Sequence, residues 1–394
     1  MKTRQFSYST QQGWKNLEEA VLLDSNQTLI LAFCAPSFRD NEEVFKKLKE
    51  KFPHSSVVGC STSGEILGLE IHDLSLSLVA LKFEQGTFKV AALQIDNSHQ
   101  SEQIGRQLAD QLSAPDLKGI FIFSDGLSTN GSKLVAGINS IISKDIVIAG
   151  GLAGDGANFS HTWVLHENKI KSNTIIAVGL YGKSLNITNA SRAGWDKFGP
   201  ERVITKSSGN ILFEIDNRPA LDLYKEYLGE KSKELPASGL FFPLQIRSSK
   251  VDENRLIRTI LAINEEQKSI TFAGDVPEGH IAQLMKANFE RVIEAANEAG
   301  EVIKKSNIEN SQATSSKLTL AISCVGRRLV LGERAEEELE ALMTTLPEKS
   351  LLTGFYSYGE IGATLTGGAS DLHNQSMTVI SLIENLNQTA KGSA

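Results

Sequence analysis

Cysteine is scarce in this chain of 394 residues, which contains only Cys34, Cys60 and Cys324. No C-x-x-C pair occurs, so the sequence lacks the spacing of a zinc ribbon and the motif of a thioredoxin-like redox site. Cys34 and Cys324 lie in apolar runs typical of strands, where we expect them to be buried, reduced and equivalent to small hydrophobic residues. Cys60 lies in a glycine-rich turn. A ligand-facing thiol is an alternative there, and packing is the favoured role.

The chain also lacks a basic excess and a long apolar run. Its formal net charge is −7, so it carries no positive field that would attract nucleic acid. No apolar stretch approaches the roughly 20 residues that span a bilayer. Residues 1–7 lack the apolar run of a signal peptide. We therefore expect a cytoplasmic protein that neither binds nucleic acid nor inserts into a membrane.

Common catalytic signatures are missing as well. The sequence contains no G-x-x-x-x-G-K-[ST] phosphate loop, no G-x-S-x-G nucleophile elbow and no H-E-x-x-H zinc motif. Its seven histidines include no pair spaced i, i+4. These absences favour a protein that is not an enzyme. A hydrolase or transferase that uses glycine-rich turns is the least favoured alternative, because no nucleophile and base accompany those turns.

One glycine-rich motif occurs twice, about 300 residues apart. Residues 59–66 and 354–361 both read G-x-x-x-x-G-E-I. Each copy follows a strand-like run that ends near a cysteine and then a helix-like stretch, and each precedes a histidine and an alternating strand. The same order of elements indicates duplicated βαβ-type blocks. Only the second copy is aromatic, with Tyr356 and Tyr358 on one face of the strand and Phe355 on the other.

The remaining pattern predicts the fold class. A further βαβ unit begins at Gly119, and its glycine-rich segment 150–156 occupies the place that 59–66 has in the first unit. Alternating runs indicate strands, and apolar residues every three or four positions indicate helices, the longest over 281–305. We therefore predict an α/β protein with mixed parallel and antiparallel sheets, packed helices and internally duplicated βαβ-type blocks.

The repeated motif carries one glutamate in each copy, Glu65 and Glu360. Glycines after strands allow a ligand to approach the backbone, and a neighbouring carboxylate can accept hydrogen bonds from a cationic or amide-bearing ligand. The alternative is a structural role, in which each glutamate caps a helix or pairs with an arginine. The sequence leaves both alternatives open.

Six motifs in series resemble the FIST family. In order along the chain they are Gly59–Ile66, Gly150–Gly156, Arg218–Tyr224, Phe242–Leu244, Gly354–Gly362 and His373–Asn374. The resemblance implies a FIST N-type domain over 1–212, a FIST C-type ligand-sensing domain over 213–385 and a disordered tail at 386–394. It also implies a non-catalytic sensor of a small ligand that regulates a separate histidine kinase or cyclic-di-GMP enzyme, and it allows for a homodimer.

A pair of FIST domains without a fused output domain is similar to the NosP-type proteins, which bind haem and sense nitric oxide. This resemblance makes haem b the favoured cofactor. Haem needs an axial ligand, an apolar pocket and cations for its propionates. His373 is the predicted axial ligand of the iron, although His72 holds the matching place in the first block and leaves a structural turn as the alternative. Tyr356 or Tyr358 would line the haem pocket, and Arg327 and Arg328, or Arg218, would meet the propionates. Asn374, next to His373, is a further predicted ligand-binding residue.

The second hypothesis is a haem-free sensor of an amino acid or a similar small metabolite. A carboxylate would suit the bidentate guanidinium of Arg218, and an amine would suit Glu360 or Glu65. Tyr224 lies in the same motif as Arg218 and is a further predicted ligand-binding residue.

The visible spectrum separates these two hypotheses. Haem bound through His373 would give a Soret band that is lost in His373→Ala. A colourless protein, purified after expression with haem supplied, would contradict haem binding.

Overall fold

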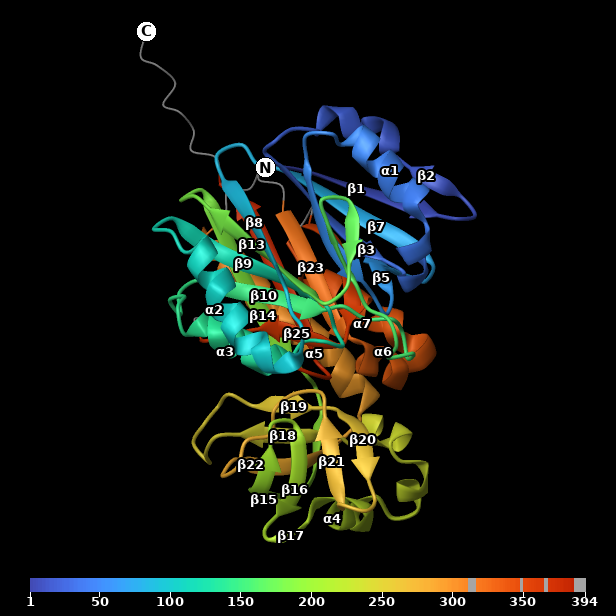
Figure 1. Cartoon of the computed structure of the whole chain (residues 1–394), viewed down its shortest axis with the longest axis vertical. Coiled ribbons are helices and arrows are strands. Elements are labelled where there is room, and N and C mark those ends of the chain that lie inside the picture. The colour runs from blue at the N-terminus through green and yellow to red at the C-terminus, as the bar shows by residue number, and fades with distance from the viewer. Residues whose placement is uncertain (311–316, 348–349, 365–367, 386–394) are drawn as a thin grey trace.

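The computed structural model describes residues 1–310, 317–347, 350–364 and 368–385, and the tail predicted to be disordered lies outside these residues. A large body contains both the first and the last part of the chain, and a smaller body is formed by the segment inserted after Arg192 (Figure 1). No helix among the described residues is long and apolar enough to cross a membrane.

Three βαβ-type blocks build the large body, each with its own sheet. In every block two parallel strands are joined through a helix, and a third strand runs antiparallel beside the first. The first block comprises β1 (Lys2–Ser9), β2 (Gly13–Lys15), β3 (Thr28–Cys34), α1 (Glu42–Lys51), β4 (Ser56–Ser61), β5 (Glu65–Leu67), β6 (Glu70–His72) and β7 (Ser75–Lys82).

The other two blocks repeat this order of elements. The second comprises β8 (Thr87–Gln94), α2 (Ser101–Leu112), β9 (Leu117–Ser124), α3 (Gly131–Asn139), β10 (Val147–Leu152), β11 (Val164–His166), β12 (Lys169–Lys171) and β13 (Thr174–Tyr181). The third comprises β14 (Leu185–Arg192), α5 (Phe289–Asn310), β23 (Lys317–Cys324), α6 (Val325–Leu331), α7 (Ala335–Thr345), β24 (Ser350–Ser357), β25 (Gly359–Gly362), β26 (Asp371–His373) and β27 (Met377–Glu384).

Each block contributes a hairpin to the sheet of another block. The β5–β6 hairpin of the first block pairs with β24 of the third, β11–β12 of the second pairs with β4 of the first, and β25–β26 of the third pairs with β10 of the second. The exchange is therefore cyclic, and no block completes its sheet alone. The predicted α/β fold with mixed sheets and repeated blocks is confirmed, and the middle block is a third copy of the repeat.

The first glycine of each repeated segment allows two parallel strands to come together. A Cβ at Gly59, Gly150 or Gly354 would lie 1.8–2.0 Å from the carbonyl oxygen of the residue paired with it on the neighbouring parallel strand. Real side chains do not tolerate such a distance, so only glycine fits these positions.

The small body is built on one antiparallel sheet, in the strand order β19-β18-β22-β15-β16-β21-β20. It holds a core of its own, which includes Ile204, Leu221 and Phe272. Its elements are β15 (Asp196–Ser208), β16 (Ile211–Ile215), β17 (Arg218–Pro219), α4 (Ala220–Leu228), β18 (Leu244–Arg247), β19 (Leu256–Arg258), β20 (Ile260–Asn264), β21 (Ser269–Phe272) and β22 (Ile281–Lys286).

The predicted helix over 281–305 is wrong at its start, because residues 281–288 are not helical. Residues 281–286 form strand β22, which pairs with β15 and β18, and the helix α5 begins at Phe289. Ala282 and Leu284 are buried in alternation, which is the period of a strand. The Asn288 side chain then accepts a hydrogen bond from the Arg291 amide at 3.3 Å, which marks the true start of the helix.

Substitution of Gly59 tests the requirement for close strand contact. We expect Gly59→Ala to lower the free energy of unfolding by about 1–3 kcal/mol, because its methyl group overlaps the Ala32 carbonyl oxygen. In the control Gly199→Ala the nearest atom to the new methyl group is 3.5 Å away, and we expect a change within about 0.5 kcal/mol. Urea denaturation measures both, and equal stabilities would contradict the requirement.

Candidate functional site

The first repeated glutamate joins the turn to the strand that follows its hairpin. Glu65 accepts hydrogen bonds from the Thr62 hydroxyl at 2.5 Å and from the amide and hydroxyl of Ser75 at 3.2 and 2.7 Å. Burial raises the pKa of this carboxyl group to about 8, and the hydrogen bonds oppose that rise. Glu65 thus fixes the base of the exchanged β5–β6 hairpin to the start of β7.

The second repeated glutamate makes the same set of contacts. Glu360 accepts hydrogen bonds from the Ser357 hydroxyl at 2.6 Å and from the amide and hydroxyl of Ser376 at 3.3 and 2.9 Å. Burial again raises the pKa, to about 8. Because both glutamates hold equivalent hairpins through equivalent partners, their geometry supports a structural role, and neither has an oxygen left without a protein partner.

His373 lies opposite Glu360 in the β25–β26 register and is buried. Its Nε2 lies 3.0 Å from the Gly362 carbonyl oxygen, which can only accept, so Nε2 carries the proton. Burial lowers the pKa of the ring to about 4, which keeps it neutral. The neighbouring Asn374 is also buried and donates from Nδ2 to the His373 carbonyl oxygen at 3.0 Å.

The two arginines predicted for haem propionates already have carboxylate partners. Arg327 is fully buried and bonds Glu338 through Nε and Nη2, at 3.0 and 2.8 Å. The Tyr356 hydroxyl donates to the same carboxylate at 2.8 Å. Arg328 forms a bidentate pair with Asp73, at 2.8 and 2.7 Å, and lies over the Tyr356 ring. Tyr356 therefore belongs to a closed ionic network.

Arg218 lies far from Glu65 and Glu360, with which it would bind opposite ends of an amino-acid ligand. It is exposed on β17, at the end of the small body most distant from β5 and β25 (Figure 1), and it pairs with Glu226. The structure therefore does not bring together the carboxylate-binding and amine-binding residues of the second hypothesis.

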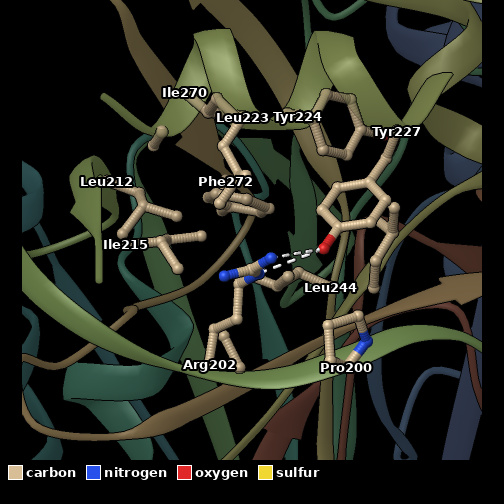
Figure 2. A pocket seen from close by; sticks show the side chains of 13 residues that line it. Pro200, Arg202, Leu212, Ile215, Leu223, Tyr224, Tyr227, Leu244, Ile270 and Phe272 are labelled. Atoms are coloured by element: carbon tan, nitrogen blue, oxygen red, sulfur yellow. Dashed lines mark hydrogen bonds between the residues drawn. The ribbon is translucent and has the colours of Figure 1, made fainter. Parts of the chain in front are cut away.

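Tyr224 also lies in the small body, where its hydroxyl donates to the Phe242 carbonyl oxygen at 2.7 Å. Figure 2 shows the small cavity beside it, across which Arg202 reaches the Tyr227 hydroxyl at 3.1 and 2.7 Å. This cavity encloses about 30 Å³, which suffices for a water molecule and not for a metabolite.

Tyr358 is the predicted residue that does face an open site. Its hydroxyl donates to Asp155, and its ring stacks on Phe159 with centroids 4.5 Å apart and planes inclined by 13°. The stacked pair lies between two adjoining cavities at the boundary between the bodies. One cavity is apolar and encloses about 580 Å³, and the other is more polar and encloses about 240 Å³.

Both bodies contribute walls to the apolar cavity. The large body supplies the end of β23, the residue after β24, helix α6 and the loops after β9 and β10. The small body supplies residues around the 3₁₀ turn η5 (Ala237–Phe241), β20 and β21. The lining residues are Leu127, Ala157, Phe159, Pro236, Ala237, Leu240, Thr259, Ile260, Leu261, Ala273, Cys324, Val325, Gly326, Leu329 and Tyr358. Ligand sites of α/β proteins commonly lie at such carboxyl ends of strands. We call this cavity and its polar neighbour the interbody cleft.

The interbody cleft gathers hydrophobic side chains that remain exposed. Four of its lining side chains are exposed over 42–47% of their surface: Leu127, Phe159, Leu261 and Leu329. Contiguous exposed apolar surface marks interaction sites, whereas single exposed residues do not. A volume of about 580 Å³ also lies within the range of small-molecule sites. The cleft is therefore the candidate functional site.

Sequence reasoning missed most of this site because its residues come from distant segments. Phe159 is a lone aromatic residue in a polar loop, and Leu261 and Leu329 lie in ordinary strand and helix patterns. A single hydrophobic residue of this kind carries no signal on its own. The described residues contain no group of three or more His, Cys, Asp or Glu side chains arranged for a metal ion. The three cysteines are free and buried, as predicted for Cys34 and Cys324.

Comparisons with known proteins place both halves of the chain in one family. Residues 28–218 match the FIST N domain, and residues 220–363 match the FIST C domain. An uncharacterized protein of Methanocaldococcus jannaschii is 22% identical over 324 residues, which cover 77% of this chain. The chain spans 60% of the length of that relative.

The raised pKa of Glu360 predicts a pH dependence of stability. The unfolded carboxyl group loses its proton near its ordinary pKa of 4.5, whereas the folded one keeps it up to about 8. The folded state therefore binds more protons between these values, and this group lowers the free energy of unfolding as the pH rises from about 4.5 to 8. Glu360→Gln should lack this contribution.

Urea denaturation between pH 5 and 9 measures the contribution of Glu360 to the free energy of unfolding. Glu230→Gln, at an exposed position, is the control. The stability of Glu360→Gln relative to the unsubstituted protein should rise with pH, and that of the control should stay constant. Parallel curves for Glu360→Gln and the unsubstituted protein would contradict the raised pKa.

Proposed function

The chain belongs to the FIST family, whose domains are signal-transduction sensors of small ligands, and from this membership we propose that it is a non-catalytic cytoplasmic sensor whose ligand binds in the interbody cleft. The observation that carries this proposal is the apolar cavity of about 580 Å³ with its ring of exposed hydrophobic side chains. The cavity beside Tyr224 is far smaller, at about 30 Å³, and the polar neighbour of the apolar cavity encloses about 240 Å³.

The chain connections around the cleft give ligand binding a route to a conformational change. The chain enters the small body after β14 and returns just before α5. Arg327 donates to the Ala193 carbonyl oxygen in the first connection and to the Val292 carbonyl oxygen in α5, each at 2.7 Å. Arg327 belongs to α6, whose Leu329 lines the cleft. A ligand that displaces α6 therefore acts on the first connection and on α5, which directly follows the second.

A few polar contacts hold the two bodies in the observed arrangement. Arg258 donates to the Leu372 carbonyl oxygen at 3.0 Å, and the Asn254 amide donates to Asp371 at 2.6 Å. Gln375 donates from Nε2 to the Leu240 carbonyl oxygen of η5 at 3.2 Å. A neutral hydrogen bond contributes about 0.5–1.5 kcal/mol and one to a charged group about 1.5–3 kcal/mol, so the contacts of a ligand can outweigh these three bonds. A ligand shifts the arrangement of the bodies if it binds two arrangements with different affinities.

The haem-free alternative is the one that the cleft supports better. His373 is bonded to Gly362 and lies outside the lining of both cavities of the cleft, so it does not fit as the axial ligand of a haem there. Haem-based nitric oxide sensing stays a prediction. If His373 were the axial ligand of the haem, its ring would first have to break its hydrogen bond to the Gly362 carbonyl oxygen. The proposed partner remains a separate histidine kinase or cyclic-di-GMP enzyme, on the strength of the family resemblance.

Filling the cleft tests whether it is the ligand site. Ala157 lines the cleft, whereas the exposed Ala262, next to Leu261 on β20, does not. We expect the purified protein either to release a bound small molecule on denaturation, detected by mass spectrometry, or to be thermally stabilised by a member of a metabolite library. Ala157→Trp should reduce the released amount or the stabilisation at least tenfold, and Ala262→Trp should change neither.

The proposal fails if Ala157→Trp releases, or responds to, the same molecule as the unsubstituted protein. It also fails if the unsubstituted protein neither releases a molecule nor responds to any library member.

A further inference from the structure

We infer that the ligand of the interbody cleft is an uncharged, largely apolar molecule with a flat ring system, a hydrogen-bonding group that meets Thr259 and an uncharged polar end. This inference rests on the proposed function and adds the chemical class of the ligand. It differs from both hypotheses drawn from the sequence, because an amino acid and a haem each carry ionised groups.

The lining of the cleft excludes a charged ligand group. Of the described residues that line the apolar cavity or its polar neighbour, none has an ionised side chain. The nearest carboxylate on the loop, Asp155, is occupied by the amides of Phe159, Ser160 and His161 at 2.7–2.9 Å and by the Tyr358 hydroxyl. An ion moved from water into such surroundings loses its hydration and gains no counter-charge in return.

The stacked aromatic pair favours a flat ligand. The Phe159 ring lies nearly parallel to the Tyr358 ring, and almost half of the Phe159 side chain remains exposed to the cleft and solvent. Leu261 from the small body and Leu329 from α6 line the same cavity. An exposed ring face flanked by aliphatic side chains binds another ring by offset stacking and apolar contact.

Thr259 supplies the polar feature of this wall. Its side chain is buried, with 5% of its surface exposed, and it lines the apolar cavity. Its hydroxyl oxygen has no hydrogen-bond partner among the described residues. Buried hydroxyl groups are nearly always paired, because an unpaired one loses its hydrogen bonds to water without compensation. The oxygen is closed off from solvent in the observed rotamer, so a rotation about the Cα–Cβ bond must turn it into the cavity before it can pair with a hydroxyl, carbonyl or amine group on the ligand.

The adjoining cavity of about 240 Å³ accommodates a further neutral polar portion of the ligand. Ser98, Thr129, Asn130 and Asn210 line it beside the shared aromatic pair. These side chains recognise hydroxyl, amide or carbonyl groups and offer no counter-charge. The cleft therefore matches a ligand whose ring system lies in the larger cavity and whose uncharged polar end extends into the smaller one.

Two fluorescent probes with one aromatic frame test the charge requirement. N-phenyl-1-naphthylamine is neutral, and 8-anilino-1-naphthalenesulfonate adds one sulfonate to the same frame. We expect the neutral probe to bind at least tenfold more tightly in fluorescence titrations. Leu329→Asp should weaken its binding at least tenfold, because the new carboxylate lies in the cavity wall. Leu22→Asp, at an exposed position (73%) outside the cleft, should have no effect.

Competition against the bound neutral probe tests the role of Thr259. Thr259→Val keeps the shape of the side chain and removes its hydroxyl group. We expect it to weaken displacement by 1-naphthol at least threefold and to leave displacement by naphthalene unchanged. Equal effects on both competitors, or none on either, would overturn the hydrogen-bonding part of the inference.

The outcomes separate this inference from the proposed function. If both probes bind equally and both are weakened by Leu329→Asp and by Ala157→Trp, the cleft is a binding site and the inferred ligand class is wrong. If neither substitution weakens the neutral probe, the cleft is not its site, and the inference fails together with the location proposed for the sensory ligand.

Discussion

The structure depends on the cyclic exchange of hairpins among three blocks. Each sheet of the large body is completed by a hairpin from another block, and equivalent glutamates, Glu65 and Glu360, fix two of these hairpins at their bases. Because every block both gives and receives strands, the three blocks pack around a shared core. This arrangement brings residues from distant segments of the chain to one end of the body, where the small body covers them.

Differences between the equivalent positions adapt the repeat to a single core. Cys60, Gly151 and Phe355 are equivalent, because each follows the first glycine of its block's repeated segment. The large ring of Phe355 stacks on Phe33 with centroids 4.8 Å apart. A Cβ at Gly151 would lie 3.1 Å from the Phe355 ring, so the glycine of one block makes room for the phenylalanine of another. Of the aromatic residues in the last copy, Phe355 thus packs in the core, whereas Tyr358 lines the cleft.

Local patterns in the sequence predicted the fold class well and the site only in part. The repeated turns and the apolar periodicities depend on neighbouring residues, so they identified the blocks and most of their elements. Residues 281–286 were assigned to a helix because their apolar residues fit either period over a short span. Tyr358 was predicted from its motif. Phe159, Thr259 and Leu329 could not be predicted, because their role arises only when the small body is placed against the carboxyl ends of β23 and β24.

Hydrogen exchange with and without saturating N-phenyl-1-naphthylamine tests whether the interbody cleft is the sensory site. We expect protection to increase in α6, in η5 and in the loop of residues 154–161, all of which contribute to or adjoin the cleft. Protection confined to β26 around His373, or to segments of the small body around the cavity of Figure 2, would contradict it.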